Sequence, residues 1–294
     1  MRDNAPVTFP DVPIRLLVMD LDGTLLPHDQ RLRPRTIEAV RGAVERGIVV
    51  SIATGRMATS LLPYARELGI HEPLIALGGA AIHAPAADGQ DRPGRLLRHR
   101  PLAPGVAREA VRWCLANGLR PHLNNVGRMI AAEDDPNAED YSWTYGGRPL
   151  VVPDLATWIT RPVSKVIAVG PPGRPAAMVA DARERFGGRA HATVSHPEFL
   201  EFFAPEVSKG RALRWLARRG GIPLANAMAI GDQLNDLEMI EAAGFGVAMP
   251  HGPAELRSAA RLVAPPLDED GAAQVIEALL LGGGPRLRRR VAAG

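Results

Sequence analysis

A short apolar run that ends in two acidic residues constrains the fold of this chain more than any other feature. Residues 14–19 (IRLLVM) are almost entirely apolar, and Asp20 and Asp22 follow at once in the segment 20–26 (DLDGTLL). An apolar run of this length, closed by glycine and polar residues, is typical of a buried parallel strand. Because unpaired charges are costly to bury, two carboxylates at its end indicate a bound cation or a chemical role.

The position of Asp20 and Asp22 suggests which chemistry they serve. Open α/β sheets bind their ligands at the carboxyl ends of their strands. A carboxylate there suits Mg²⁺, and it can also attack phosphorus to form an aspartyl phosphate, with the second carboxylate handling the leaving-group proton. A strand followed by a plain Asp-Gly turn would show the same seven residues, so this segment alone leaves both interpretations open.

A second strand follows after one helix. Apolar residues recur at helical spacing over 37–44, and residues 48–53 form another buried strand that leads into Thr54, Gly55 and Arg56. A right-handed crossover makes the two strands parallel, which places Thr54 at the same sheet edge as the acidic pair. A hydroxyl and backbone N–H groups beside a glycine suit phosphate oxygens, although a threonine at a strand end is often only a helix cap.

The pattern changes after a third strand, residues 74–77. Residues 85–105 are rich in proline, glycine and arginine, and an α+β pattern follows. It has helices over 106–117 and 174–185, strands at 129–132, 163–170 and 198–204, and an acidic, aromatic loop over 133–145. We expect a core part over 1–84 with residues 1–13 disordered, an inserted cap over 85–204, and a second core part over 205–294 with a basic tail from about residue 284.

The chain then returns to alternating strands and helices. A helix opens at Lys209, a strand over 227–230 leads into residues 231–236 (GDQLND), and a last amphipathic helix spans 271–281. Only two of the 35 basic residues are lysines, Lys165 and Lys209. The first turn of a helix disfavours a cation by about 0.3–1 kcal/mol, so a lysine kept at 209 indicates that a compact ammonium is needed there. A solvated surface lysine is the alternative.

Composition excludes several classes of protein. The net charge is +3, no apolar run approaches the roughly 18 residues of a membrane span, and the one cysteine, Cys114, lies in a helical pattern as a small core residue. We therefore expect a cytoplasmic protein with no membrane or nucleic-acid partner, its basic tail at 286–290 being solvated. The sequence indicates no oligomeric state.

Four motifs in order resemble those of the haloacid dehalogenase superfamily, and more closely those of its Cof-type phosphatases. They are DLDGTL at 20–25, ATGR at 53–56, KG at 209–210 and GDQLND at 231–236, and the likeness covers about residues 14–281. Only 34 residues (54 − 20) separate Asp20 from Thr54, which is too short for a helical cap domain. The 155 residues (209 − 54) before Lys209 leave room for the cap there.

The resemblance implies a role for each motif. Asp20 is the nucleophile, and Asp22 protonates the leaving oxygen and then activates water. Mg²⁺ is held by the Asp20 carboxylate, the backbone carbonyl of Asp22, and Asp232. The remaining positions implied by the likeness bind phosphate or substrate (Thr54, Gly55, Arg56, Lys209 and Asn235, the last toward phosphate or Lys209) or support the waters on the metal (Asp236).

These features predict a doubly wound α/β protein with an inserted α+β cap. The expected function is Mg²⁺-dependent hydrolysis of a small phosphorylated metabolite, such as a sugar phosphate. A phosphomutase-like relative and a catalytically idle binding or regulatory protein of the same fold are the alternatives. Gly78 departs from the family, which often has asparagine there. The loop over 133–145, with Asn124 and Asn125, is the expected source of substrate contacts, and replacing Lys165 by arginine is expected to have little effect.

Overall fold

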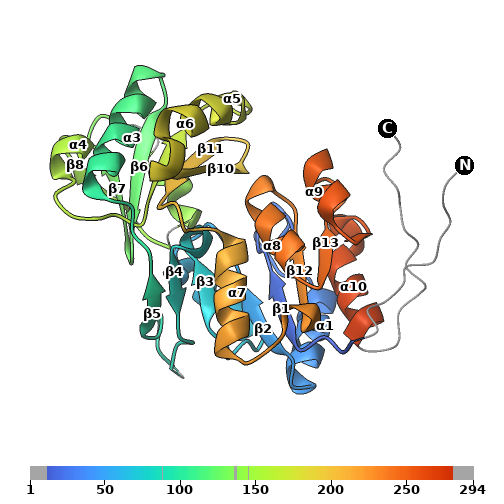
Figure 1. Ribbon diagram of the computed structural model, residues 1–294. Coiled ribbons are helices and arrows are strands. Elements are labelled where there is room, and N and C mark those ends of the chain that lie inside the picture. Colours follow the sequence, from blue (N-terminus) through green and yellow to red (C-terminus); the bar gives the residue numbers. More distant parts are fainter. Residues whose placement is uncertain (1–11, 88, 136–137, 145, 281–294) are drawn as a thin grey trace, which may run out of the picture. The chain divides into compact units, whose positions relative to one another are not determined.

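The computed structural model describes residues 12–87, 89–135, 138–144 and 146–280, and the chain divides into two compact units. The first unit comprises Met1–Thr54, Pro63–Leu74 and Lys209–Gly294, and the second comprises Gly55–Leu62 and Ile75–Ser208. The basic tail and all but two residues of the expected disordered segment 1–13 lie outside the described residues. Each unit has its own sheets and is described by itself (Figure 1).

The first unit is built on a five-stranded sheet in the order β14-β13-β12-β1-β2. Every neighbouring pair of strands in it is parallel. The strands are β1 (Leu16–Met19), β2 (Val49–Ile52), β12 (Ala227–Gly231), β13 (Phe245–Ala248) and β14 (Leu262–Val263). All four residues of β1 are buried, as expected for a central strand that is covered on both faces.

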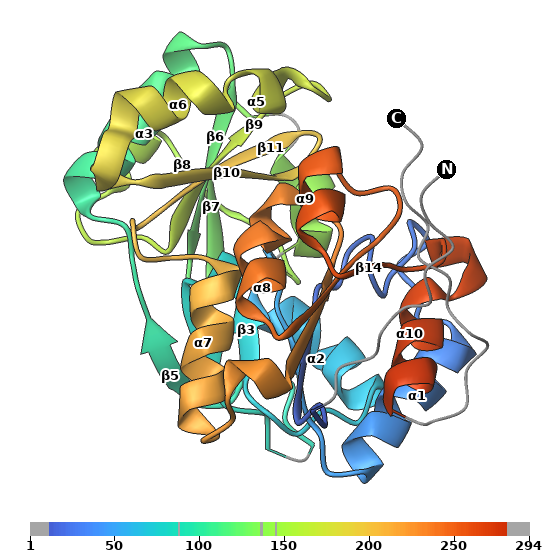
Figure 2. The ribbon, with the colours of Figure 1, turned by 45° about the vertical axis from the view of Figure 1, so that its right-hand side comes forward.

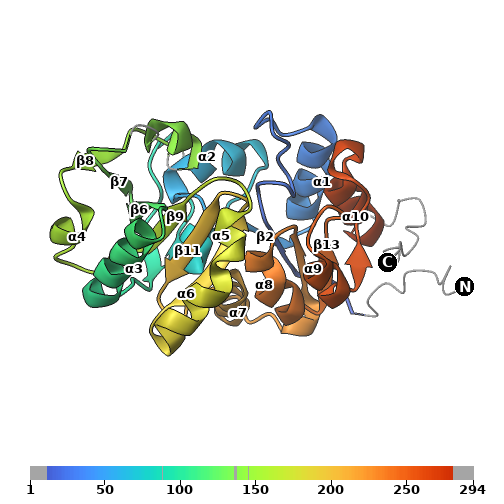
Figure 3. The ribbon, with the colours of Figure 1, turned by 90° about the horizontal axis from the view of Figure 1, so that it is seen from above.

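Helices lie on both faces of this sheet, as Figure 3 shows for α1 and α10 on one side and α7, α8 and α9 on the other. Arg35 of α1 donates to both carboxylate oxygens of Glu277 on α10, at 2.8 and 2.6 Å. The predicted doubly wound parallel sheet is therefore confirmed. The helices are α1 (Pro34–Glu45), α7 (Lys209–Arg219), α8 (Leu237–Ala242), α9 (Ala254–Ala259) and α10 (Gly271–Leu280), while α2 (Ala58–Glu67) is shared between the two units.

The strand register brings three of the predicted site residues to one edge of this sheet. Met19, the last residue of β1, pairs with Ile52 of β2 on one side and with Ile230 of β12 on the other. Asp20 and Thr54 therefore follow the carboxyl ends of neighbouring strands, and Asp232 follows the carboxyl end of β12. This edge is where a parallel α/β sheet binds ligands.

The second unit contains a six-stranded sheet in the order β10-β11-β9-β6-β7-β8, antiparallel except for the pair β7 and β8. A three-stranded sheet has the order β3-β4-β5. The predicted strand at 74–77 is therefore β3 of this small sheet. The strands are β3 (Leu74–Ala76), β4 (Ala81–His83), β5 (Leu96–His99), β6 (Arg120–Asn125), β7 (Arg128–Ala132), β8 (Leu150–Val152), β9 (Lys165–Val169), β10 (His191–His196) and β11 (Phe199–Phe203).

The helices of the second unit cover one face of its larger sheet, as Figure 2 shows for α3 and α6. Leu123, Val166 and Phe202 point into the core on that face together with Cys114, so the prediction of a small core residue at Cys114 is confirmed. The helix expected over 174–185 is two helices that meet at Met178. The helices are α3 (Pro104–Ala116), α4 (Leu155–Trp158), α5 (Arg174–Ala177) and α6 (Val179–Phe186).

Short 3₁₀ helices complete the fold and include part of the expected acidic loop. They span Leu77–Gly79, Ala138–Thr144, Gly187–Arg189, Leu224–Asn226, Leu234–Asp236 and Leu267–Glu269. Residues 136, 137 and 145 of that loop lie outside the described residues. None of the helices in the described ranges combines the length and apolar character needed to cross a membrane.

Candidate active site

Asp20 lies at the edge of the sheet, directly after the central strand β1, and is buried. Its backbone N–H donates to the carbonyl of Ile230 at 2.9 Å, which continues the ladder between β1 and β12 by one residue. The backbone then turns at once, since the N–H groups of Leu25 and Leu26 both donate to the carbonyl of Leu21, at 2.9 and 2.8 Å. The segment 20–26 thus holds one carboxylate rigidly at the strand end.

Lys209, the first residue of α7, joins this carboxylate from the other part of the sequence. Its Nζ lies 2.7 Å from Oδ1 of Asp20 and 2.7 Å from Oδ1 of Asp236, and its side chain is only 1% exposed. The alternative of a solvated surface lysine is therefore wrong. Burial disfavours the ammonium, but the two carboxylates outweigh that effect and raise the pKa of Lys209, so its charge is retained.

Asp236 uses both of its oxygens to order the loop after β12. Its Oδ1 accepts from Lys209, while its Oδ2 accepts from the backbone N–H groups of Asp232 and Gln233, each at 3.0 Å. Lys209 therefore pairs with Asp236, whereas the sequence had suggested Asn235 as a possible partner. Oδ1 of Asn235 is buried and has no hydrogen-bond partner among the described residues.

Asp232 is held by side chains that the motif analysis did not single out. Thr24 donates its hydroxyl to Oδ1 at 2.9 Å, and Gln233 donates its amide to Oδ2 at 3.2 Å. His251 Nε2 lies 3.5 Å from the same Oδ2. Gly23 has φ +79°, and a Cβ there would lie 2.4 Å from Asp232 Oδ2, so only glycine permits this approach. Thr24 lies within the motif at 20–25 and Gln233 within the motif at 231–236, so membership of a motif could have marked both as site residues.

The charges at this edge suit a divalent cation. Asp20, Asp232 and Asp236 are buried, and each offers one oxygen such that these oxygens lie within 4.8 Å of one another. Three carboxylates against one ammonium leave a net charge of −2, and burial together with mutual repulsion raises the pKa of Asp20 well above its ordinary value. A hard cation with oxygen ligands relieves this imbalance. Both oxygens of Asp236 accept from Lys209 and from backbone N–H groups, and both oxygens of Asp232 accept from Thr24 and Gln233, so hydrogen bonds alone do not select the ligands among the three carboxylates.

The remaining predicted site residues lie along the same two strand ends. Asp22 is half-buried and forms an isolated bridge to Leu26 in the turn after β1, and Thr54, which is buried, follows β2. Gly55 and Arg56 are assigned to the second unit, where Arg56 is buried and its carbonyl accepts from Leu77 N–H at 2.8 Å. The structure thus collects Asp20, Asp22, Thr54, Lys209, Asn235, Asp232 and Asp236 in the first unit.

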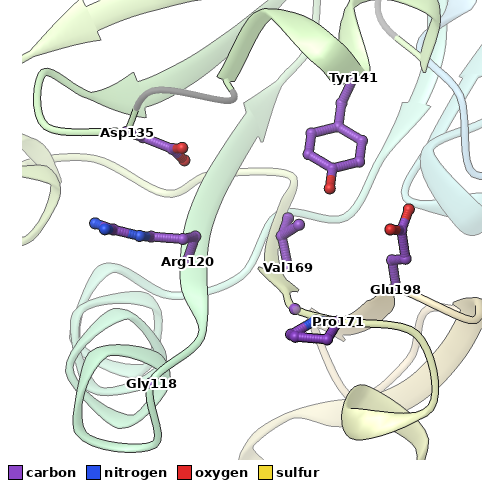
Figure 4. Close-up of a pocket in the computed structure, with 8 residues that line it drawn as sticks. Gly118, Arg120, Asp135, Tyr141, Val169, Pro171 and Glu198 are labelled. Carbon is purple, nitrogen blue, oxygen red and sulfur yellow. The ribbon is translucent and has the colours of Figure 1, made fainter.

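The second unit has a pocket of about 350 Å³ at one end of its larger sheet, lined by both charged and apolar residues. In Figure 4, Arg120 and Asp135 lie on one side of it, and Tyr141 and Glu198 on the other. Asp135 also pairs with the buried His122 at 2.7 Å. Burial, Glu198 and other nearby carboxylates raise the pKa of Tyr141, so its phenol is kept protonated. Asp135 and Tyr141 come from the loop that we expected to contact substrate.

Asn124 and Asn125, also expected to contact substrate, are engaged locally. The amide of Asn124 is buried and donates to Sδ of Met57 at 3.7 Å, and Oδ1 of Asn125 accepts from the N–H of Val126 at 2.9 Å. Asn124 lies at the strand end that meets residues 55–57, where it pairs with Lys165, whereas the pocket lies at the opposite end of β6 and β9, where Arg120 pairs with Val169.

Comparison with known proteins identifies the family. The sequence profile of haloacid dehalogenase-like hydrolases matches residues 17–276. The chain is 31% identical over 247 residues to the HMP-PP phosphatase of Cronobacter sakazakii, covering 82% of this chain and 88% of that protein. It is 26% identical over 268 residues to the 5-amino-6-(5-phospho-D-ribitylamino)uracil phosphatase YcsE of Bacillus subtilis, covering 90% and 96%.

A solved structure shows the same fold. The crystal structure of a haloacid dehalogenase-like hydrolase from Bacteroides thetaiotaomicron aligns with a TM-score of 0.76 and 27% identity, covering 91% of this chain and all of that one. The predicted resemblance is confirmed for the family, matched over residues 17–276, and for the fold of a parallel sheet with an inserted α+β part. This chain is a hydrolase and belongs to the haloacid dehalogenase-like family.

Proposed function

We propose that the chain is a Mg²⁺-dependent phosphatase that hydrolyses a small phosphorylated metabolite through an aspartyl phosphate. The observation that carries this proposal is the buried set of Asp20, Lys209, Asp232 and Asp236 at the carboxyl ends of parallel strands. A phosphoryl group brings further negative charge, so a site for it needs a fixed ammonium and a cation beside the attacking carboxylate. Lys209 and the metal would meet both needs.

The proposed reaction gives the two aspartates the roles that the family resemblance implies. A carboxylate oxygen of Asp20 attacks phosphorus, the bond from phosphorus to the leaving oxygen breaks, and the carboxylic acid of Asp22 donates its proton to that oxygen. In the second step, the Asp22 carboxylate takes a proton from water, the water oxygen attacks phosphorus, and the bond to Asp20 breaks. Inorganic phosphate leaves, and both aspartates return to their starting state.

The other residues of the site hold charge and position. Lys209 would contact phosphoryl oxygens as well as Asp20, and Thr54, Gly55, Arg56 and Asn235 are the further proposed phosphate or substrate contacts. Mg²⁺, held by Asp20, Asp232 and the backbone carbonyl of Asp22, would neutralise the charge that develops on the phosphoryl oxygens. Asp236 would keep Lys209 oriented rather than bind the metal itself.

The substrate class is supported by the names of the relatives. They are phosphatases of HMP-PP and of a phosphorylated ribitylaminouracil, both small phosphorylated compounds. We propose that residues 85–204 form a cap that selects the substrate, with the loop over 133–145, which includes Asp135 and Tyr141, and with Asn124 and Asn125 as the contributors. We also propose that the enzyme acts in the cytoplasm and needs no nucleic-acid or membrane partner.

The test is release of inorganic phosphate from p-nitrophenyl phosphate with Mg²⁺ and with EDTA, followed by a panel of phosphorylated metabolites that includes both relatives' substrates. We expect activity with Mg²⁺ only, and loss of about three orders of magnitude or more in Asp20→Asn, which keeps the shape of the side chain but removes the attacking charge. Activity of Asp20→Asn above a few per cent of the unsubstituted enzyme would show that the covalent route is wrong.

A further inference from the structure

The face of the larger sheet that is turned away from the helices carries a buried ion pair. Lys165 of β9 and Glu201 of β11 lie on adjacent strands, and their side chains are 3% and 2% exposed. The ammonium contacts Oε1 of Glu201 and also donates to the backbone carbonyl of Gly55 at 2.8 Å. Lys165 therefore joins the sheet to Gly55, one of the residues that we propose bind phosphate.

The ammonium of Lys165 is enclosed on its third side by an aromatic ring. Its Nζ lies 5.7 Å from the centre of the Phe203 ring. That ring also fills the space beside Gly78, where an added Cβ would lie 2.6 Å from Cζ of Phe203 and where φ is +62°. In this chain the ring of Phe203 thus occupies the room that a side chain at 78 would need.

Stability alone is a weak reason to bury Lys165 and Glu201. Replacing a buried ion pair by apolar residues of similar volume is often neutral or stabilising. The second oxygen of Glu201, Oε2, is buried without a hydrogen-bond partner among the described residues, so the pair does not use all its bonding capacity. The pair does supply one specific hydrogen bond, from the Lys165 ammonium to the carbonyl of Gly55, in the bend between β2 and α2.

That bond determines how the peptide after Gly55 is oriented. In a trans peptide, the carbonyl and the following N–H point in opposite directions. With the Gly55 carbonyl held by Lys165, the N–H of Arg56 must point away from the ammonium. We propose that Lys165, held in place by Glu201, is a positioning residue that keeps Gly55 and Arg56 in their phosphate-binding conformation. The phosphate-binding part of this inference rests on the proposed function.

The test compares a variant that lacks the ion pair with a control variant that has a smaller core side chain on the same strand. The double variant Lys165→Met/Glu201→Leu removes the ion pair but keeps side-chain volume, so its Tm should stay near that of the unsubstituted protein. The control, Val166→Ala, shortens the neighbouring residue on β9, which points into the core on the other face. It should lower Tm without disturbing Gly55 and Arg56.

Hydrogen exchange and phosphate binding then separate the two variants. In the double variant we expect exchange of the amides of residues 54–57 to rise about tenfold, and the Kd for inorganic phosphate with Mg²⁺ to rise about tenfold. With p-nitrophenyl phosphate, KM should rise more than kcat falls. Val166→Ala should keep the Kd and KM of the unsubstituted protein. Unsubstituted-level exchange and phosphate affinity in the double variant would overturn the proposal.

Two provisions keep the outcome clear. If the double variant does not fold, Glu201→Gln replaces it, since it preserves shape and leaves Lys165 without its counter-charge. Exchange at residues 54–57 should then rise about threefold, and unchanged exchange would overturn the proposal. Exchange needs no catalysis, so if the unsubstituted protein hydrolyses no phosphomonoester, the proposed function fails while the anchoring of Gly55 and Arg56 is still judged.

Discussion

Asp236 offers the sharpest test of how the site is held together, because one buried side chain satisfies three donors. Replacing it by alanine removes the acceptor for the Lys209 ammonium and for the backbone N–H groups of Asp232 and Gln233. Lys209 keeps Asp20 as a partner, but the two N–H groups are left in a buried loop with no acceptor.

The size of the effect follows from these contacts. Hydrogen bonds to a charged group contribute about 1.5–3 kcal/mol each, and breaking a buried pair costs about 3–5 kcal/mol. Removing Asp236 also relieves its repulsion with Asp232, which places the expected loss for Asp236→Ala near the lower end, at about 3 kcal/mol. For a unit of this size that is a fall in Tm of roughly 6–12 °C, at about 2–4 °C per kcal/mol.

The matched variant is Asp236→Asn, which keeps an oxygen for the two backbone donors but turns an amide N–H₂ toward Lys209. We expect about half the loss of Asp236→Ala, and the exposed Asp268→Ala should change stability by no more than about 0.5 kcal/mol. Calorimetric or urea unfolding in EDTA measures all three. Equal losses for the alanine and asparagine variants, or an Asp236→Ala loss no larger than that of Asp268→Ala, would refute the reasoning.

The remaining predictions concern metal, charge, pH and substrate choice. Asp232→Asn should raise the Mg²⁺ concentration for half-maximal activity about tenfold, and an unchanged metal titration would remove Asp232 from the metal site. Lys209→Arg should lower kcat/KM about 100-fold, because a wider and longer guanidinium cannot take the enclosed place of a compact ammonium 2.7 Å from both Asp20 and Asp236; a loss under about threefold would contradict this. Burial lowers the pKa of His83 and His99, so the unfolded chain binds protons more readily, and the free energy of unfolding should fall as pH drops below about 6.5. Thermal melts at several pH values should show a flatter dependence for His83→Gln, and the same slope as the unsubstituted protein would contradict this. Tyr141→Phe should change the ranking of large phosphorylated substrates but not hydrolysis of acetyl phosphate; if both fall together, the cap helps to build the catalytic site.

The catalytic part of the fold was readable from the sequence because its signals are local. An apolar run ending in Asp20, a second run ending in Thr54 and a third leading to Asp232 each predict a strand with a polar carboxyl end, and parallel pairing then brings those ends together. The resemblance to a known family added the assignment of roles, which no periodicity supplies.

The second unit was read less completely because its strands lack such signals. β4 and β5 are short, and β5 is only partly buried within a segment rich in proline and glycine. β6 reads RPHLNN, with Leu123 as its one aliphatic side chain and with Pro121 near its start, so its sequence does not predict a strand. Contacts between distant residues, such as Thr24 or His251 with Asp232, were also missed, since sequence spacing does not specify which side chains meet across a loop.

The only two lysines of the chain, Lys165 and Lys209, lie in similar surroundings. The sequence predicts a need for a compact ammonium at Lys209, but a nearly silent exchange of Lys165 to arginine. Both ammonium groups are buried and paired with a carboxylate, and Lys165 also bonds to a backbone carbonyl. A guanidinium is wider, planar and longer in reach, so it cannot take the place enclosed by Glu201, Gly55 and Phe203 without moving one of them. The structure therefore reverses that expectation: Lys165→Arg should disturb Gly55 and Arg56, and the rarity of lysine marks both positions for the same physical reason.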